Sequence, residues 1–416
     1  PKYNWTRSTL TQGESSTSSL VSNNTFTTTF SLNFAKFLER FYSPSSSTSS
    51  YNRYSSKSSN SNSSSKVFEA KNIYMKSLLK LLHEISEKMS SFSISITHAV
   101  VNEYSNIDTD FEPSYDFKLG LIDSPVPFEE LTTIQANPSQ SFIYGNEYDD
   151  EFKIGTSLQI SPKISLTNID YRKTRTRNYP SNGDSVETIS ETYFPQGKDG
   201  KSGLPLFNWS LNISSLQTYW NLADWFTNIM INHSFSGTKT ESYNEGILQT
   251  LTFTKNFNPY IGLTFKFRKP KDFSISIFNN RTLTINNQKL TFDQFKIDRA
   301  YSQTTTLSLD WTKRKARELK LFRRSYDIEN EIVFSLDLTA DESYTEESTV
   351  DLDIFEITTF SETYTIKPSI TYGFSEWIDG TFYVSHMIKE TSTIPKKSDT
   401  SIGFDIRIYF ESRSSN

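Results

Sequence analysis

The segment that ends in Gly200, Lys201 and Ser202 has the residue order found at the end of a phosphate-binding loop. That motif also requires a glycine at position 195 and a helix after the serine. This chain has Pro195 at that position, and Pro205 and a strand-like segment follow in place of a helix. We therefore expect a glycine-rich surface loop here and no nucleotide site.

Metal ligation is the next chemistry that the side chains could support. The chain has four histidines, and no pair of them has the spacing of metal ligands. His98, His233 and His386 lie inside segments in which apolar and polar residues alternate, whereas His83 lies in a segment with helical spacing. We expect the three strand histidines to face a lumen or an interface and to bind no metal.

Calcium is the ion that the acidic clusters could hold. Asp149, Asp150 and Glu151 are consecutive, and Asp108 and Asp110 lie close together. Such carboxylates are usually solvated, so we expect no bound ion at either cluster. No Ser/His/Asp set and no pair of carboxylates has a supporting context. The sequence therefore predicts a protein that is not an enzyme, with no catalytic, cofactor-binding or metal-binding residues.

A run of basic residues between two expected strands comprises Lys313, Arg314, Lys315, Arg317, Lys320, Arg323 and Arg324. The run could bind anionic lipid head groups at a membrane surface, or it could form a solvated turn, and we favour the turn. The chain as a whole has a formal net charge of -5 and a pI near 5.6. This balance gives no reason to expect a nucleic-acid partner, which would require a clustered basic face.

Composition favours β-structure. The 416 residues include 32 Phe and 22 Tyr, but only 14 Gly and 4 Met. Cysteine is absent, which excludes disulfides, thiolate metal sites and cysteine nucleophiles. No apolar stretch of about 18 residues occurs, so we expect no transmembrane helix. Because the chain begins with Pro1, we expect a mature chain or a fragment of a longer one.

Alternation of apolar and polar residues is the strongest pattern in the chain. In the last expected strand, Ile402, Phe404 and Ile406 alternate with Gly403 and Asp405. Successive side chains leave a strand on opposite faces, so this pattern gives one apolar and one polar face. Its repetition in many segments of about 9–11 residues is typical of a transmembrane β-barrel wall.

We therefore predict an all-β fold, an antiparallel transmembrane barrel wall of about 14–16 strands that forms part of a larger barrel with long polar loops. Residues 43–65 are Ser-rich and are expected to form a flexible loop, and residues 172–206 a long polar loop. Ile73–Met89 fits either an amphipathic helix or a helix-like entry into the next strand, and Tyr115–Leu121 could be a strand.

Three tryptophans, Trp209, Trp311 and Trp377, lie near the ends of expected strands. An aromatic girdle at a lipid–water boundary would place them there, although ordinary edge or core aromatics could do the same. Two other classes of protein remain open. One is a self-contained porin or transporter of the outer membrane, and the other is a surface β-rich adhesin with a sandwich core.

Several short blocks of the chain occur in an order that resembles the end of the SprA (Sov) family of outer-membrane translocons. These blocks are Tyr3-Asn4-Trp5, Phe92–Thr97, Phe142–Gly145, Leu204–Leu211, Ile231–Ser236 and Phe257–Leu263. Ser215 departs from the glycine that the family usually has before Leu216, and the Ser-rich insertion is not a family hallmark. The resemblance covers most of the chain and implies that residues 1–416 are the C-terminal portion of such a protein.

The resemblance implies a protein-conducting barrel of the type 9 secretion system, in the outer membrane of a Gram-negative, Bacteroidota-like bacterium. The implied partners are outer-membrane lipid, secreted cargo proteins, a PorV-like shuttle, a plug protein and the rest of the parent chain. In several gliding bacteria the same protein is needed for motility, so a cell-surface motility role is also implied. The wall itself would be a passive pore wall without bond chemistry.

Overall fold

The computed structural model describes the chain except for residues 1, 13–14, 40–72, 120, 123, 127–133, 137–142, 181–183, 290–294, 314–318, 322–323, 327–329, 349–353, 376 and 410–416. The Ser-rich range 43–65 therefore lies outside the described residues. The described chain is dominated by one antiparallel sheet of 15 strands, which confirms the predicted all-β fold class.

The strands of the sheet follow the chain almost without exception. They are β1 (Lys2–Gln12), β2 (Ser15–Leu32), β3 (Phe92–Ile107), β4 (Ile143–Ser161), β5 (Ile164–Pro180), β6 (Val186–Thr192), β7 (Asn208–Ile213), β8 (Phe226–Asn244), β9 (Ile247–Phe267), β10 (Phe273–Lys289), β11 (Phe295–Lys313), β14 (Ile332–Ser348), β15 (Glu356–Gly373), β16 (Ile378–Thr391) and β17 (Lys397–Ile408). A separate hairpin, β12 (Leu319–Leu321) with β13 (Arg324–Tyr326), lies between β11 and β14.

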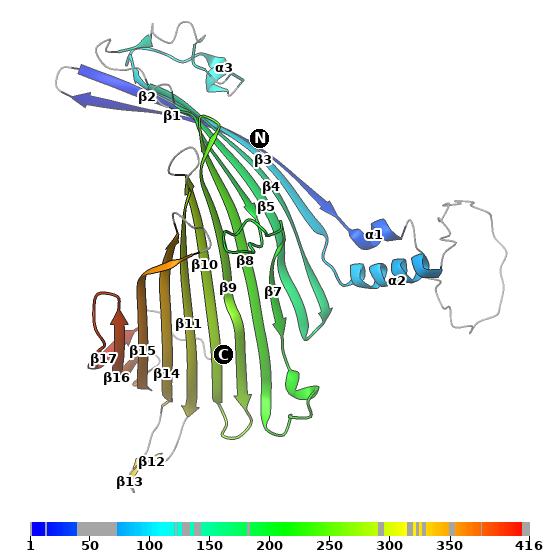
Figure 1. Cartoon of the computed structure of the whole chain (residues 1–416), viewed down its shortest axis with the longest axis vertical. Helices are drawn as coiled ribbons and strands as arrows, with labels where there is room; N and C mark the ends of the chain where they lie inside the picture. The colour runs from blue at the N-terminus through cyan, green and yellow to red at the C-terminus, as the bar shows by residue number, and fades with distance from the viewer. Residues whose placement is uncertain are drawn as a thin grey trace, which may run out of the picture.

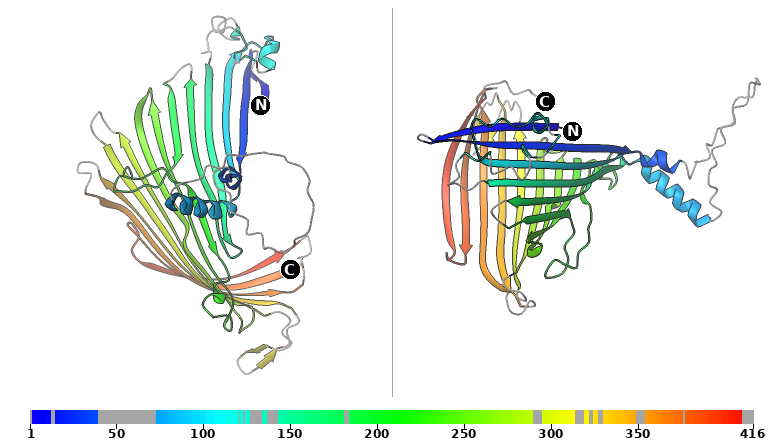
Figure 2. Two further views of the ribbon diagram at one scale, coloured as in Figure 1. Left: turned by 90° about the vertical axis from the view of Figure 1, so that its right-hand side faces the viewer. Right: turned by 90° about the horizontal axis from the view of Figure 1, so that it is seen from above.

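The sheet is curved into an open arc, as Figures 1 and 2 show. In the described structure β1 pairs only with β2, and β17 pairs only with β16, so the arc has two free edges. Most strands are antiparallel neighbours joined by short connections, such as the turn from Ser161 to Ile164 between β4 and β5. The alternating segments on either side of Pro162 predict a hairpin there, and β4 and β5 form it.

Two strands share one position in the sheet. β6 pairs with β5 and β8 at one level, and β7 pairs with the same two strands further along. Between them, residues 193–207 leave the sheet and return; we call this segment the excursion. The range 172–206, expected as a long polar loop, therefore contains the end of β5 and all of β6. Its polar residues alternate along paired strands whose two faces both accept polar side chains.

The helices are short and few in the described chain. They are α1 (Phe34–Leu38), α2 (Ile73–Glu87) and α3 (Tyr115–Lys118), and none is long and apolar enough to cross a membrane. α2 confirms the helical alternative for its segment. The prediction that Tyr115–Leu121 could be a strand is wrong, because the Ser114 side chain accepts a hydrogen bond from Phe117 N and caps a helical turn.

Some segments that the sequence predicts as separate strands form one longer strand. The alternation predicts strands over 246–256 and 260–268, but β9 joins nearly all of both, and its pairing with β10 shifts between Asn279 and Arg281. Pro259 lies at this irregularity, where a missing N–H disturbs the ladder least. The sequence likewise predicts strands over 350–358 and 364–374, and β15 joins the end of the first to nearly all of the second. The strands therefore extend well beyond the length needed to cross a bilayer.

Buried side chains form two small cores on the sheet. One is formed by Leu20, Tyr104, Ile107, Phe117 and Ile134, where the segment after β3 folds back over β2 and β3. The other is formed by Tyr193, Leu251, Phe253, Ile285 and Ile297, where the excursion covers β9, β10 and β11. Both cores lie against one face of the wall, so most of the remaining sheet is covered by nothing in the described structure.

Candidate functional surfaces of the sheet

Strand register brings apolar residues of many strands onto one face. Ile277 lies opposite Leu307, Leu307 opposite Leu338, and Leu338 opposite Ile366, so one row crosses four strands. Residues paired across strands share a face, and every second residue along each strand joins them. We call this surface the apolar belt. It comprises Phe30, Ile94, Ile96, Phe152, Ile154, Leu166, Leu211, Ile231, Leu263, Ile277, Leu307, Leu338, Ile366, Phe382 and Phe404, with their apolar neighbours on the same face.

The apolar belt lies on the same face of the sheet as the residues that the excursion covers, Leu251, Phe253 and Ile285. The excursion runs on the convex side of the arc (Figures 1 and 2), so the belt lies on that side, open to the surroundings. Phe30 is 54% exposed, Ile96 46% and Ile402 70%. Soluble monomers rarely expose a continuous apolar surface of this extent. The belt must therefore meet an apolar medium or another apolar surface, because leaving each such side chain in water costs about 1–2 kcal/mol of unrealised burial energy.

The opposite, concave face is polar and internally hydrogen-bonded. The Ser308 hydroxyl donates to Asp337 Oδ1 at 2.6 Å, and the Ser335 hydroxyl donates to Asp310 Oδ1 at 2.7 Å. The Thr304 hydroxyl donates to a third carboxylate, Asp341, at 2.7 Å. These side chains alternate with the residues of the apolar belt, so the same strands carry apolar side chains on one face and hydrogen-bonding groups on the other.

Aromatic rings line one end of the belt. The ring centroids of Phe226 and Phe267 are 4.7 Å apart, and those of Trp311 and Phe334 are 5.5 Å apart. Trp377 lies at the same end, directly before β16. Trp209 does not, because it packs against Phe235, with the ring centroids 4.5 Å apart, in the middle of the sheet. The three tryptophans thus lie at two different levels.

The height of the belt differs between strands. On β15 the residues of the belt face from Tyr364 to Tyr372 are all apolar or aromatic, and eight residues at about 3.3 Å each span roughly 26 Å, or about 20 Å along the normal at a tilt of about 40°. On β11 the apolar run is shorter, because Thr305 and Gln303 follow Leu307 on the same face. The belt is therefore somewhat shorter than the apolar band of outer-membrane barrels, which is about 25 Å tall.

Beyond Tyr301 the same convex face carries ion pairs. Lys239 Nζ lies 2.7 Å from Glu241 Oε1, and Arg299 Nη1 lies 2.8 Å from Glu346 Oε2. Charged pairs of this kind are stable in water and costly in lipid. The wall therefore changes from an apolar to a charged convex surface part-way along its strands.

The excursion packs on this charged half of the convex face. Its Phe194 ring lies 5.0 Å from the Phe235 ring, and Tyr193 lies 5.5 Å from Phe253, centroid to centroid. The Asn287 side chain donates a hydrogen bond to the Asp199 carbonyl oxygen at 3.1 Å. Tyr193 is buried under the segment, and this burial raises the pKa of its phenol. The segment is thus an ordered cover over three strands.

The Gly-Lys-Ser residues lie within this cover. Lys201 N donates to Asp199 Oδ1 at 3.0 Å, and Ser202 N donates to the Gln196 carbonyl at 3.2 Å. These backbone donors already have protein acceptors, and β7 follows the segment in place of a helix. The phosphate-loop geometry is therefore not formed here.

The histidines lie on separate elements and have separate partners. His98 Nδ1 lies 2.7 Å from Asp150 Oδ1, and His233 Nδ1 lies 2.6 Å from the Tyr260 carbonyl oxygen. His386 Nδ1 lies 2.8 Å from Thr400 Oγ1. His83 is buried on α2. By register His98 and His386 lie on the convex face, where both follow residues of the apolar belt along their strands.

The acidic run on β4 is divided between two faces and four partners. Asp150 pairs with His98 and with Arg177, Asp149 accepts from Thr176 at 2.6 Å, and Glu151 lies 2.8 Å from Arg172 Nε. Asp108 Oδ1 accepts from Asp110 N at 2.9 Å. No group of three acidic or histidine side chains that could hold a metal ion occurs within the described part of the chain. Of the basic run, Lys313 ends β11, and the side chains after it lie outside the described residues.

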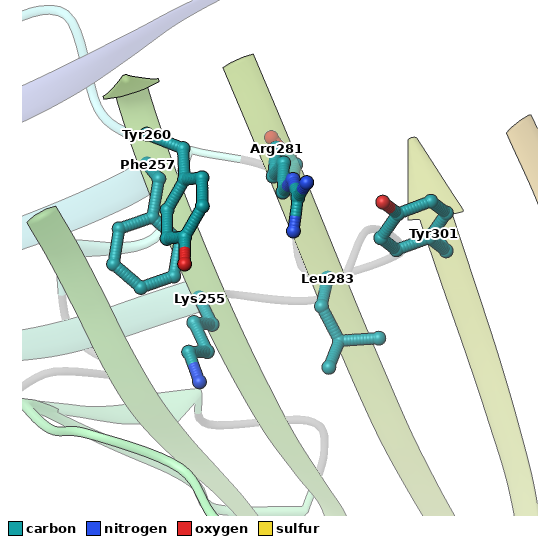
Figure 3. A pocket seen from close by; sticks show the side chains of 7 residues that line it. Lys255, Phe257, Tyr260, Arg281, Leu283 and Tyr301 are labelled. Carbon is teal, nitrogen blue, oxygen red and sulfur yellow. The ribbon is translucent and has the colours of Figure 1, made fainter. Parts of the chain in front are cut away.

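A pocket at the upper limit of the apolar belt is the site that sequence reasoning missed. A cavity of about 320 Å³ is lined by Lys255, Phe257, Tyr260, Arg281, Thr282, Leu283 and Tyr301 (Figure 3). These residues come from β9, β10 and β11. The available signal was the presence of Lys255 and Arg281 at positions that the alternation reserves for apolar residues.

No protein-family model and no curated protein matches this chain.

Proposed function

We propose that this chain forms part of the wall of a large outer-membrane β-barrel that conducts proteins, in the manner of SprA-like translocons of the type 9 secretion system. The observation that carries the proposal is the apolar belt. It crosses the sheet from β2 to β17 on the convex face, while the concave face is polar. A wall with this division can separate lipid from a water-filled lumen.

The mechanism would be passive. Paired strands satisfy each other's N–H and C=O groups, so a wide opening can exist in hydrocarbon without exposed backbone. The curved sheet supplies the shape, and its hydrogen-bonded polar face offers passing protein a wet surface with few apolar residues. No bond is made or broken, and cargo, shuttle and plug would be recognised by other parts of the assembly.

The free edges β1 and β17 favour a larger barrel over a self-contained one. An exposed edge strand presents unpaired backbone groups, which is costly in lipid and invites pairing. In a larger barrel, strands from the rest of the parent chain would pair with both edges. A self-contained porin-like barrel stays a second candidate, because 14 strand positions are enough to close a barrel by themselves.

The test uses the full-length parent protein in its own cells. We expect it in the outer-membrane fraction, as a band whose electrophoretic mobility changes on heating, and we expect a deletion strain to retain secreted cargo inside the cell. Recovery of the protein in the soluble or medium fraction would contradict the membrane proposal and favour an adhesin. Outer-membrane location with undisturbed secretion would favour a porin instead.

A further inference from the structure

The cavity beside Tyr260 begins one residue pair above the apolar belt. Asn279 lies opposite Ile261 at the upper limit of the belt, and Arg281 lies opposite Phe257 immediately beyond the pairing shift. Leu283 then lies opposite Lys255, one step further from the belt. If the belt faces lipid, as proposed above, this cavity lies at the depth of the lipid head groups.

Two cations of this cavity differ from the other cations around them. Lys239, Arg299 and Arg177 on the same convex face each pair with a carboxylate. Lys255 and Arg281 pair with none among the described residues. Unpaired cations beside apolar surface are unfavourable unless an anion joins them.

Aromatic rings hold the two cations in place. Lys255 Nζ lies 4.3 Å from the centroid of Phe194, a residue of the excursion, and the Arg281 guanidinium lies 4.4 Å from the centroid of Tyr260. Arg281 Nε donates to Asn279 Oδ1 at 2.9 Å, so the guanidinium is fixed while its terminal NH₂ groups have no acceptor in the described structure. Such a guanidinium is suited to bidentate binding of a phosphate.

The residues that line the cavity also suit a ligand with one charged end and one apolar end. Leu283 and Phe257 give the cavity apolar walls, and Ile261 continues the apolar surface directly below it. A phosphate in the cavity would have its attached chains over the belt. The nearest acidic residue along this row is Glu342, which lies beyond Gln303 on β14 and leaves the cavity itself without a carboxylate.

We infer that this cavity binds the phosphate of an anionic lipid head group, with Lys255 and Arg281 as its ligands and the lipid chains on the apolar belt. The inference rests on the proposed function, since it requires the belt to face lipid. It adds a defined lipid site to an otherwise non-specific contact. The excursion contributes Phe194 as one wall, so its ordered packing maintains the site.

The test measures binding of phosphatidylglycerol, phosphatidylcholine and inorganic phosphate to the purified full-length protein in detergent, by native mass spectrometry. We expect preference for phosphatidylglycerol, and a loss of about tenfold or more in its affinity for the Lys255→Gln/Arg281→Gln variant. Lys255→Arg/Arg281→Lys should keep the preference, because both charges remain. Lys367→Gln is the matched control: its Nζ lies 4.4 Å from the Tyr383 ring centroid, on the concave face.

Each outcome decides between explanations. Inorganic phosphate that binds as tightly as phosphatidylglycerol would assign the cavity to a free anion and overturn the lipid inference. Equal lipid preference in the native protein and in the Gln/Gln variant would also overturn it. Heat-dependent mobility of every variant is measured in parallel: a variant that inserts normally and binds lipid normally refutes the inference but leaves the barrel wall intact. Failure of the native protein to insert refutes both.

Discussion

Gly200 lies where the excursion turns directly over the sheet. Its φ is +79°, and a Cβ added there would lie 2.5 Å from the Phe253 ring. Glycine is therefore required twice, once by the backbone conformation and once by the close approach. The Gly-Lys-Ser order that resembles a phosphate loop is explained by this packing, because the turn needs a glycine and the next residues return towards β7.

Replacement of Gly200 tests this dual requirement. We expect Gly200→Ala to lower the free energy of unfolding by roughly 2–4 kcal/mol, from the left-handed backbone and the steric clash together. Gly246 is the matched control, since its φ is +76° and nothing lies within 4 Å of an added Cβ. Gly246→Ala should cost only about 1 kcal/mol. Unfolding in urea measures both, and equal losses would contradict the packing role.

Asn208 is the first residue of β7, where the chain returns from the excursion to the sheet. Its Oδ1 accepts from Gly237 N at 3.1 Å, and its Nδ2 donates to Asp170 Oδ2 at 3.2 Å. We expect Asn208→Ala to destabilise the protein by about 1–3 kcal/mol, because it leaves polar groups unpaired where the strand is interrupted. Asn212→Ala, at an exposed position of the same strand, should change stability by less than about 0.5 kcal/mol. Similar losses at the two positions would argue against this role of Asn208.

At the scale of elements, the strands of the wall can be tested one face at a time. Leu307 lies in the row of the apolar belt that crosses β10, β11, β14 and β15, and Thr306 lies beside it on the concave face. An arginine in place of Leu307 should cost about 2–4 kcal/mol if that side chain meets hydrocarbon, whereas an arginine at Thr306 should cost far less.

Folding of the two variants into lipid vesicles, followed by heat-dependent mobility, gives the comparison. We expect Leu307→Arg to fold poorly and Thr306→Arg to fold nearly as well as the native protein. The reverse order would exchange the lipid and lumen faces. Equal and small effects would indicate that neither face meets lipid.

The elements also show which parts of the fold could be predicted. β17, with Ile402, Phe404 and Ile406 in strict alternation, was predicted because period-two patterning directly reports two different environments. The segment 172–206 was not, because polar residues occur on both faces of β6 and the pattern disappears. α3 was missed because a local cap at Ser114 decided its conformation over only a few residues.

The two surfaces of interest, the apolar belt and the cavity, also differ in how well local alternation predicts them. The apolar belt could be predicted because each strand contributes its own alternating segment to it. The cavity with Lys255 and Arg281 could not, because its residues come from neighbouring strands and meet only through a register shift between Asn279 and Arg281. Register depends on long-range pairing, which a single sequence does not encode locally.

At the scale of the whole molecule, the two edges decide between a wall segment and a closed barrel. These 416 residues contain no cysteine, so pairs of cysteines introduced here have no native thiol of this chain to compete with them. Cysteines form a disulfide only where their Cα atoms come within about 7 Å. Thr6→Cys on β1 combined with Ser401→Cys, and then with neighbouring positions of β17, samples the registers in which these edges could meet.

In the full-length parent protein we expect no disulfide between β1 and β17, because each edge should pair with a strand from the rest of the chain. Ser385→Cys with Ser401→Cys is the positive control, since these two residues lie directly opposite each other on β16 and β17. A disulfide across the edges in one particular register would instead mean that the arc closes on itself. Closure would limit the lumen to that of a 14-position barrel, which suits small solutes and leaves too little width for folded protein. The state of the two edges therefore determines the size of what this wall can conduct.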